Sequence, residues 1–304
     1  MRNTYTYDNI TWIDLERPTR DELRDVVKEY SIHPYVEKEL LTTSAKPKVE
    51  LYDNFLYTIL HFPALKRGRP QEEGQEVDFL IGKNFIITVR YDGVDPLVDF
   101  AKTFEARSIT DKETRKIEPS LIFMQMVLRL YQAVDEELDI LNSSLEHIQG
   151  QIFQEKERQM VIAISRAERG LLNLEKGLLF HEEILESLRE TGESFFDKSF
   201  SSNLNAVREV QRNIKRSIEQ TSRYLGELRK TNDSLLSLKQ NEIMRVFTVM
   251  AFIIFPLSLL NDILNINSPY NPIHGVQDDF WIIIGIIAFS GIVMYLFFKG
   301  KRWL

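Results

Sequence analysis

Residues 244–264 read MRVFTVMAFIIFPLSLLNDIL, and residues 280–298 read FWIIIGIIAFSGIVMYLFF. A bilayer core of ~30 Å needs roughly 20 helical residues, so each run is long enough to cross a membrane. The second run contains no charged residue, which is rare in the buried helix of a soluble protein. The two runs therefore predict a pair of transmembrane helices near the C-terminal end of the chain.

The positions of basic residues predict the orientation of these spans. The connection 261–279 contains no Lys or Arg, whereas the outer flanks of both runs are basic. These flanking residues are Lys239, Arg245, Lys299, Lys301 and Arg302. By the positive-inside rule, we expect both termini in the cytoplasm and the connection outside. The first ten residues, MRNTYTYDNI, are too polar for a signal peptide.

The composition of the 304 residues excludes several function classes. The mean hydropathy of −0.23 suggests a soluble protein. This average is low because residues 1–243 hold 34 basic and 42 acidic side chains. Such an acidic body argues against nucleic-acid binding. The absence of cysteine excludes a disulfide framework and cysteine-based zinc or catalytic sites. Since no phosphate loop, dinucleotide glycine pattern or nucleophile elbow occurs, we expect neither an enzyme nor an organic small-molecule substrate.

The first third of the chain has a mixed pattern. Thr19 and Glu22 form a capping box that predicts a helix from about residue 20. Residues 55–62, 77–81 and 84–90 are short runs rich in β-branched and aromatic residues, which predict strands of one sheet. The expected fold class is therefore an α+β cytoplasmic domain, with a mixed sheet flanked by helices, joined by a long stalk helix to the two spans.

A long helix is predicted between this domain and the membrane. No proline occurs between Pro119 and Pro256, and one helix from about residue 203 to 262 would be roughly 90 Å long. Apolar and small polar residues recur along it at steps of three and four, a pattern typical of helices that pack at shallow angles. They are Val207, Gln211, Ile214, Ile218, Thr221, Leu225, Leu228, Asn232 and Leu235. A simple alternative is a coiled-coil stalk that only holds a membrane anchor.

The expected division of the chain has seven segments. They are 1–115 (cytoplasmic α/β domain), 116–200 (cytoplasmic helical hairpin region), 201–243 (stalk helix), 244–264 (first span, lining a pore), 265–279 (external loop), 280–298 (second span) and 299–304 (basic cytoplasmic tail).

One face of the first span, here called the polar row, repeats at steps of three and four and carries four polar residues among apolar ones. The row comprises Met244, Thr248, Ala251, Phe255, Ser258, Asp262 and Asn265, and we expect it to keep the register of the stalk pattern. Polar residues on one face of a span normally point into a bundle or a water path. In a homo-oligomer the row becomes rings around an axis, and rings of oxygens at a pore mouth select cations. The alternative for Asp262 is a carboxylate at the membrane interface.

Short motifs along the whole chain resemble those of CorA-type magnesium transporters. The most specific is the junction of stalk and span, NEIMRVFT at 241–248 followed by FPL at 255–257. The others are WIDL at 12–15 with Pro18 and Thr19, IHP at 32–34, KPKVE at 46–50, GKN at 82–84 followed by FIITVR, and KRWL at 301–304.

The resemblance implies a funnel-shaped homopentamer in the plasma (inner) membrane. Five first spans would line the pore, the second spans would form an outer ring, and divalent cations, chiefly Mg²⁺, would pass down the axis driven by the membrane potential. Metal bound between cytoplasmic domains would favour the closed state. The expected partners are other copies of the chain and the lipid bilayer. No cofactor is expected besides the divalent cation, which is both the transported and the regulatory ion.

The resemblance also assigns particular residues. Met244 and Phe247 match the hydrophobic constriction of the family. Asn265, Ile266 and Asn267 match its Gly-Met-Asn filter, with only the last Asn retained, so Asn267 and Asp262 are expected to meet the hydrated ion. Glu39 fills the first position of the regulatory metal site, but the stalk motif is altered and only Glu209 keeps a carboxylate there, so weaker or relocated metal sensing is expected. Because the filter and the stalk acid are altered, an open alternative is a paralogue that prefers Zn²⁺, Co²⁺ or Ni²⁺, or a non-conducting regulatory subunit.

Overall fold

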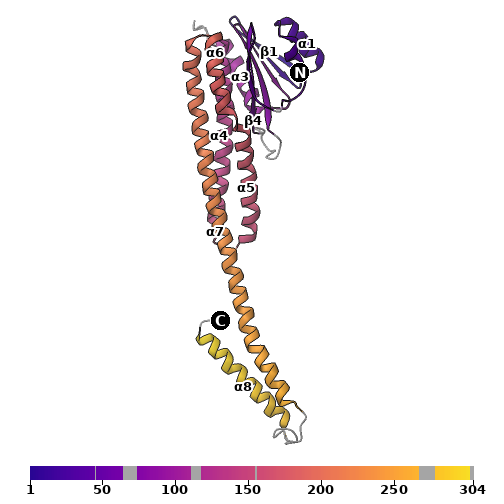
Figure 1. Ribbon diagram of the computed structural model, residues 1–304, viewed down its shortest axis with the longest axis vertical. Coiled ribbons are helices and arrows are strands. Elements are labelled where there is room, and N and C mark those ends of the chain that lie inside the picture. The colour runs from indigo at the N-terminus through magenta and orange to yellow at the C-terminus, as the bar shows by residue number, and fades with distance from the viewer. Residues whose placement is uncertain (45, 64–73, 111–117, 155, 267–277, 302–304) are drawn as a thin grey trace. The chain divides into compact units, whose positions relative to one another are not determined.

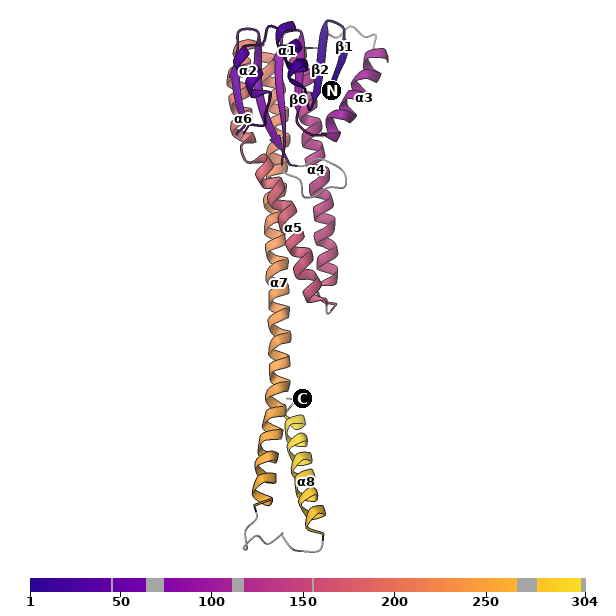
Figure 2. The same cartoon turned by 90° about the vertical axis from the view of Figure 1, so that its right-hand side faces the viewer.

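The computed structural model describes residues 1–44, 46–63, 74–110, 118–154, 156–266 and 278–301. The chain forms two compact units, Met1–Arg229 and Lys230–Leu304. The first unit contains one sheet and its covering helices, together with the N-terminal part of a long helix (Figures 1 and 2). The second unit contains the remainder of that helix and one further helix.

One six-stranded mixed sheet organises the first unit. Its order is β1-β2-β6-β5-β4-β3, in which β2 and β6 are parallel and all other neighbours are antiparallel. The strands are β1 (Arg2–Tyr7), β2 (Ile10–Glu16), β3 (Lys48–Leu51), β4 (Phe55–Phe62), β5 (Gln75–Gly82) and β6 (Phe85–Arg90). The structure confirms the three predicted strands and adds three that the sequence pattern did not single out.

The helices α1 (Arg20–Glu29) and α2 (Pro34–Glu39) cover one face of the sheet. The predicted capping box is confirmed, because the Thr19 hydroxyl accepts from the Glu22 N–H and the Glu22 carboxylate accepts from the Thr19 N–H. Apolar side chains of the two helices and the sheet form a buried cluster between them. Burial of such apolar surface is the main stabilising contribution to the unit.

Four helices cover the other face: α3 (Asp95–Thr110), α4 (Pro119–Gln151), α5 (Glu157–Leu178) and α6 (His181–Phe195). Trp12 packs on Phe104 of α3, with ring centroids 5.6 Å apart, and its indole N–H donates to Thr88 Oγ1. Beside it the buried Arg90 pairs with Asp14 at 2.8 Å. The helices and the sheet thus enclose a second core that includes a paired buried charge.

His181 fixes α6 against both α4 and the sheet. Its Nδ1 lies 2.6 Å from the Tyr131 hydroxyl, and its Nε2 lies 2.6 Å from the His61 carbonyl oxygen. Burial lowers the pKa of His181 to about 4, so the ring is neutral at pH 7. The neutral ring can donate from Nε2 to the carbonyl and accept the tyrosine proton at Nδ1, which satisfies all three buried groups.

The long helix α7 (Lys198–Leu264) confirms that one helix joins the stalk pattern to the first span. It contains Pro256, which has no N–H and removes the hydrogen bond to the Phe252 carbonyl. Membrane helices tolerate such a proline because neighbouring groups re-satisfy the freed backbone.

The stalk pattern packs within the chain itself. Its positions from Val207 to Leu228 are buried, and flanking polar residues bond to the neighbouring helices. Thr221 donates to Asn142 of α4 at 2.8 Å, and Arg229 pairs with Glu168 of α5 at 2.9 Å. This part of α7 is therefore a member of an intramolecular helical bundle, so the repeat needs no second copy of the chain to explain it.

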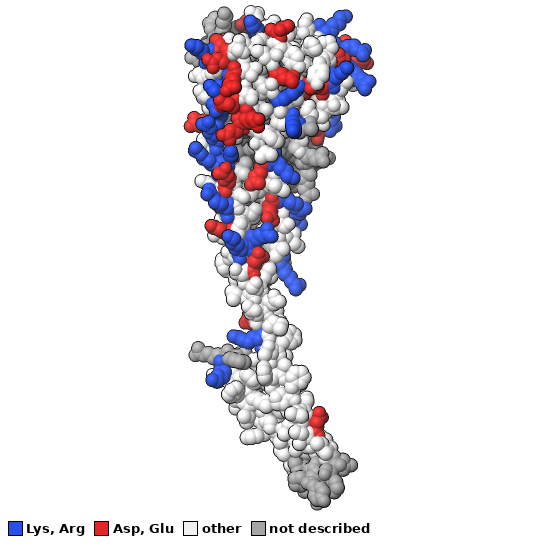
Figure 3. Space-filling model, in the orientation of Figure 1, with Lys and Arg blue, Asp and Glu red and all other residues white. Residues whose placement is uncertain are grey.

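The second unit contains two helices that are long and apolar enough to cross a membrane, the C-terminal part of α7 and α8 (Asp279–Gly300). Only 6% and 0% of their most apolar stretches are buried within the chain, whereas a core helix of a soluble protein would be mostly buried. Figure 3 shows charged side chains spread over the first unit and very few on the second. These helices therefore present their apolar side chains outward.

A close approach between α5 and the end of β4 gives a test of this packing. A Cβ on Gly177 would lie 2.5 Å from the Pro63 nitrogen, whereas a Cβ on Gly170 of the same helix would meet nothing closer than 3.8 Å. Gly177→Ala should therefore destabilise the protein by about 1–3 kcal/mol through overpacking. The control Gly170→Ala should stabilise it by roughly 0.5–1 kcal/mol through helix propensity. Denaturant unfolding measures both, and equal effects at the two sites would contradict the contact.

Candidate functional site

The first span has one face that packs against α8. Val249 is fully buried, and Val246, Ile253, Leu257 and Leu260 on the same side are partly buried. A Cβ on Gly291 of α8 would lie 3.5 Å from Leu257 Cδ1. Farther along the pair, the Phe252 and Phe298 rings are 6.5 Å apart. This apolar face is therefore occupied within the chain.

The polar row lies on the other side of the helix. At 3.6 residues per turn, its centre is about 170° from the centre of the face that packs on α8. Met244 and Phe255 are 57% and 73% exposed, and Thr248, Ser258, Asp262 and Asn265 are exposed as well, with Ala251 partly buried. Within the described residues, every member of the row except Ala251 is therefore exposed on the single chain, and Phe247 beside it is also exposed.

The register of the row differs from the expectation. Steps of 7, 11 and 3 residues return to one side of a helix. Leu228, the partly buried Leu235, Val246 and Val249 are separated by these steps, so they lie on the same side of α7. The stalk pattern therefore continues into the face that packs on α8. The prediction that the polar row keeps this register is wrong, since the row begins two positions out of step, at Met244.

Local hydrogen bonds decide which polar atoms the row presents. The Thr248 hydroxyl donates to the Met244 carbonyl at 2.8 Å, and the Asn265 amide nitrogen donates to the Asn261 carbonyl at 2.8 Å and side-chain oxygen at 2.9 Å. Because their donors are used within the helix, both side chains offer oxygen lone pairs outward. With the Asp262 carboxylate, the row presents acceptors, which is the chemistry that suits a cation.

The predicted filter is only partly described. Ile266 is 56% exposed at the end of α7, next to Asn265, and Asn267 lies outside the described residues. The structure therefore brings Asp262, Asn265 and Ile266 together on the last turns of one helix, and says nothing of the third filter position.

The predicted regulatory acids have different surroundings. Glu39, at the end of α2, is 2.6 Å from Lys48 Nζ, which also lies 3.1 Å from Glu50. Burial opposes the charge on Lys48, but hydrogen bonds to these two carboxylates outweigh it and raise the lysine pKa. Glu209 is exposed on α7. Lys48 belongs to the quoted KPKVE motif, and sequence reasoning missed its role as the partner of Glu39.

Within the described ranges, no group of three or more His, Cys, Asp or Glu side chains is placed to hold a metal ion. A regulatory site of the kind implied by the resemblance would draw Glu39 and Glu209 from two different chains. One chain therefore supplies separate halves of such a site.

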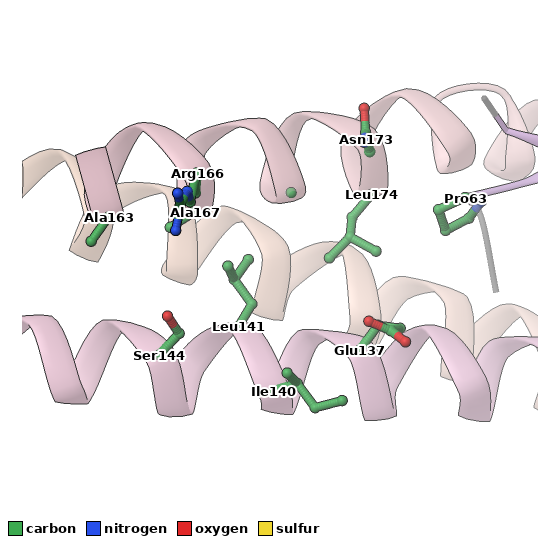
Figure 4. A pocket seen from close by; sticks show the side chains of 11 residues that line it. Pro63, Glu137, Ile140, Leu141, Ser144, Ala163, Arg166, Ala167, Asn173 and Leu174 are labelled. Atoms are coloured by element: carbon green, nitrogen blue, oxygen red, sulfur yellow. The ribbon is translucent and has the colours of Figure 1, made fainter. Parts of the chain in front are cut away.

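A hollow of about 340 Å³ lies between α4 and α5 (Figure 4). It is lined mainly by apolar and small side chains, with two charged groups at its edge. The lining residues are Pro63, Glu137, Ile140, Leu141, Ser144, Ala163, Arg166, Ala167, Gly170, Asn173 and Leu174. Nothing in this set of side chains identifies a ligand.

Comparisons with known proteins agree with this architecture. The family profile of the CorA-like Mg²⁺ transporter protein matches residues 7–302. The chain is 24% identical to the cobalt/magnesium transport protein CorA of Thermotoga maritima over 300 residues, covering 97% of this chain and 83% of the relative. It is 21% identical to the magnesium transport protein CorA of Campylobacter jejuni, covering 97% and 92%.

Two solved structures share the fold. The CorA magnesium transporter of Methanocaldococcus jannaschii superposes with a TM-score of 0.82 at 17% identity, covering 99% of this chain and 94% of that one. The full-length CmaX protein gives a TM-score of 0.74 at 16% identity, covering 97% and 89%. The similarity extends over both units of the chain.

Cysteine labelling tests whether the polar row faces water. The chain has no cysteine, so each variant carries a single thiol. In lipid vesicles, Thr248→Cys and Ser258→Cys should react with a charged, water-soluble thiol reagent, because their side chains lie on the uncovered polar face. The matched controls Val249→Cys and Leu257→Cys, on the face that packs on α8, should stay unmodified. Lack of labelling at both Thr248→Cys and Ser258→Cys would rule out a water path along the row, and equal labelling of the two faces would contradict the covered position of Val249 and Leu257.

Proposed function

The chain belongs to the family of CorA-like Mg²⁺ transporter proteins, and we propose that it carries divalent cations, chiefly Mg²⁺, passively through the axial pore of a homopentamer. The observation that supports this proposal is the uncovered polar face of the first span. Its hydroxyl, carboxylate and amide oxygens lie about 170° from the face that packs on α8. Polar groups facing lipid would be costly, so the face needs either other copies of the helix or water.

Rotation about a five-fold axis satisfies both requirements. If the polar faces of five α7 helices point inward, Thr248, Ser258 and Asp262 become rings of oxygens around a water-filled path. The α8 helices then lie outside, between α7 and the lipid, and their apolar side chains suit that place. The proposed topology has both termini in the cytoplasm of a cell bounded by the plasma (inner) membrane.

The outer end of the pore would select the ion. Mg²⁺ holds its waters tightly in octahedral geometry, so neutral oxygens that accept from this hydration shell suit it. We assign this role to the Asn265 and Asn267 amides, and assign the concentration of cations to the Asp262 carboxylates. Five carboxylates around one axis make this mouth strongly negative.

The inner end of the span carries the proposed gate. Met244 and Phe247 are exposed on the single chain, and around an axis they would form an apolar ring that closes by expelling water. No nucleotide is needed to drive transport, because a doubly charged ion gains ~4.6 kcal/mol per 100 mV of membrane potential.

The proposed regulation pairs Glu39 of one chain with Glu209 of the next around a divalent cation. In the single chain Lys48 already neutralises Glu39 at 2.6 Å. A cation would therefore have to displace an ammonium group, which lowers its affinity for the site. We accordingly expect gating by metal that requires more Mg²⁺ than an unpaired acid would.

A second candidate is a paralogue with a shifted ion preference for Zn²⁺, Co²⁺ or Ni²⁺, or a regulatory subunit that does not conduct. The sequence Asn265-Ile266-Asn267 favours it, because Ile266 places an apolar side chain beside the filter oxygens. One similar protein is itself a cobalt/magnesium transport protein. The cation that gives the highest flux separates these candidates.

Flux into liposomes tests the proposal. Purified full-length protein should admit Mg²⁺ along an imposed negative-inside potential, and the rate should rise with that potential. Asn267→Ala should abolish the flux, and Asp262→Asn should lower it several-fold by reducing the cation concentration at the mouth. The control Ile263→Ala changes a neighbouring exposed side chain that lies off the polar row, so it should keep the wild-type rate.

The outcomes separate the candidates. No flux of Mg²⁺, Zn²⁺, Co²⁺ or Ni²⁺ would overturn the transport proposal and favour the regulatory subunit. Flux of a transition metal without Mg²⁺ would favour the shifted paralogue. Unchanged flux in Asn267→Ala would move the filter to Asp262 and Asn265.

A further inference from the structure

Two acidic side chains of β5 lie inside the first unit, on the face of the sheet covered by α1 and α2. Asp78 is 0% exposed and Glu76 is 4% exposed. Their side chains are neighbours on one face because they are two residues apart in a strand, and the two carboxyl groups are within hydrogen-bonding reach of each other. The functional residues proposed above include neither of them.

Each carboxyl group has one oxygen that is bonded and one that is not. Asp78 Oδ2 accepts from the Tyr57 hydroxyl at 3.2 Å and the Tyr91 hydroxyl at 3.1 Å. Glu76 Oε2 accepts from the Ser44 N–H at 2.7 Å and lies 3.2 Å from His61 Nε2. Asp78 Oδ1 and Glu76 Oε1 are buried without a partner in the described part of the chain.

The charges around the pair can neutralise at most one of the two acids. Among the described residues no basic side chain pairs with Asp78, and the one basic group beside Glu76 is His61, whose Nε2 lies 3.2 Å from Glu76 Oε2 and 2.9 Å from the Ser44 carbonyl oxygen. The cation nearest in the network, Lys48, lies 4.8 Å from the centre of the Tyr57 ring and is already paired with Glu39 and Glu50. Two adjacent buried carboxylates that share at most this one counter-charge would repel each other.

We propose that Asp78 and Glu76 form a buried proton-binding site, which holds one proton between the two carboxyl groups at neutral pH. We assign the proton to Asp78, because Glu76 Oε2 already accepts from the Ser44 N–H and lies 3.2 Å from His61 Nε2. Asp78 Oδ1–H then donates to Glu76 Oε1, and this single proton satisfies both orphaned oxygens. Burial, followed by the charge of Glu76, raises the Asp78 pKa well above its usual range, in the direction that the geometry requires.

The site connects to the segment that carries Glu39. Ser44, whose N–H bonds to Glu76, lies between α2 and β3. On the other side, the Tyr57 hydroxyl donates to Asp78 and the Tyr57 ring contacts the Lys48 ammonium group. Lys48 in turn pairs with Glu39. Loss of the proton would place a second negative charge beneath this segment, so the site makes the surroundings of Glu39 sensitive to pH.

The direction of the pH effect follows from linkage. A carboxyl group whose pKa is raised on folding contributes stability that is present below its unfolded value of ~3.9 and is lost as the pH rises through the folded value. His61, whose pKa is raised by the hydrogen bond to Glu76, acts in the same direction. The contribution of Asp78 to the melting temperature of the first unit should therefore fall as the pH rises from about 4 through the folded pKa of Asp78, and Asp78→Asn should flatten this fall.

Infrared spectroscopy of the full-length protein tests the site directly. At pH 7 the wild type should show the C=O stretch of a neutral carboxylic acid, with a shift in D₂O. Asp78→Asn, whose amide can still donate to Glu76, should lack this band. The matched control Asp25→Asn, on the exposed side of α1, should retain it. Absence of the band in the wild type, or its survival in Asp78→Asn, would overturn the proposal.

A second variant keeps the test decisive if Asp78→Asn does not fold. Tyr91→Phe removes a hydroxyl that stabilises the Asp78 carboxylate, so the pH at which the band disappears should rise. An unchanged or lower midpoint would contradict a proton on Asp78. The wild-type band should be the same in excess Mg²⁺ and in a chelator. If Mg²⁺ abolishes it, the pair binds a metal instead of a proton.

Discussion

The arrangement of the second unit depends on one constraint: α8 covers only one side of the first span. One α8 helix packs on one side of α7, where Val249 is buried and Leu257 meets Gly291. On the opposite side, the hydroxyl, carboxylate and amide groups are exposed within the described part of the chain. In a bilayer such groups require partners or water. A single chain provides neither on that side, so the polar face is the strongest argument for assembly and for a path along its axis.

The first unit follows from a different constraint, the burial of one mixed sheet between helices on both faces. The long helix α7 also packs in this unit, and that packing explains the residue pattern that most resembles a coiled-coil stalk. Thr221 and Asn142 form a polar contact inside the bundle at 2.8 Å. The polar face of the span and family membership therefore support an oligomer, and the repeat of the stalk does not.

Strong local signals predicted much of the fold. The capping box at Thr19, the aromatic and β-branched strands, the proline-free helix and the two apolar runs each depend on residues close together in sequence. The register of the polar row was predicted wrongly, because a step pattern of three and four fits several faces of a long helix, and only the contacts of Val246 and Val249 decide among them. The partners Lys48 and Glu39 are nine residues apart, and their pairing depends on how α2 meets β3. Asp78 was a visible signal, since an acid inside the otherwise apolar run 77–81 requires a proton or a counter-charge.

The central claim is that the polar face of α7 surrounds a common axis, with α8 outside. An electron cryomicroscopy map of the full-length protein in lipid nanodiscs with Mg²⁺ measures this directly. We expect five copies, with Ser258 and Asp262 directed at the axis and Val249 directed at α8. A ring in which α8 lines the axis, or a chain that remains single in the bilayer, would contradict it.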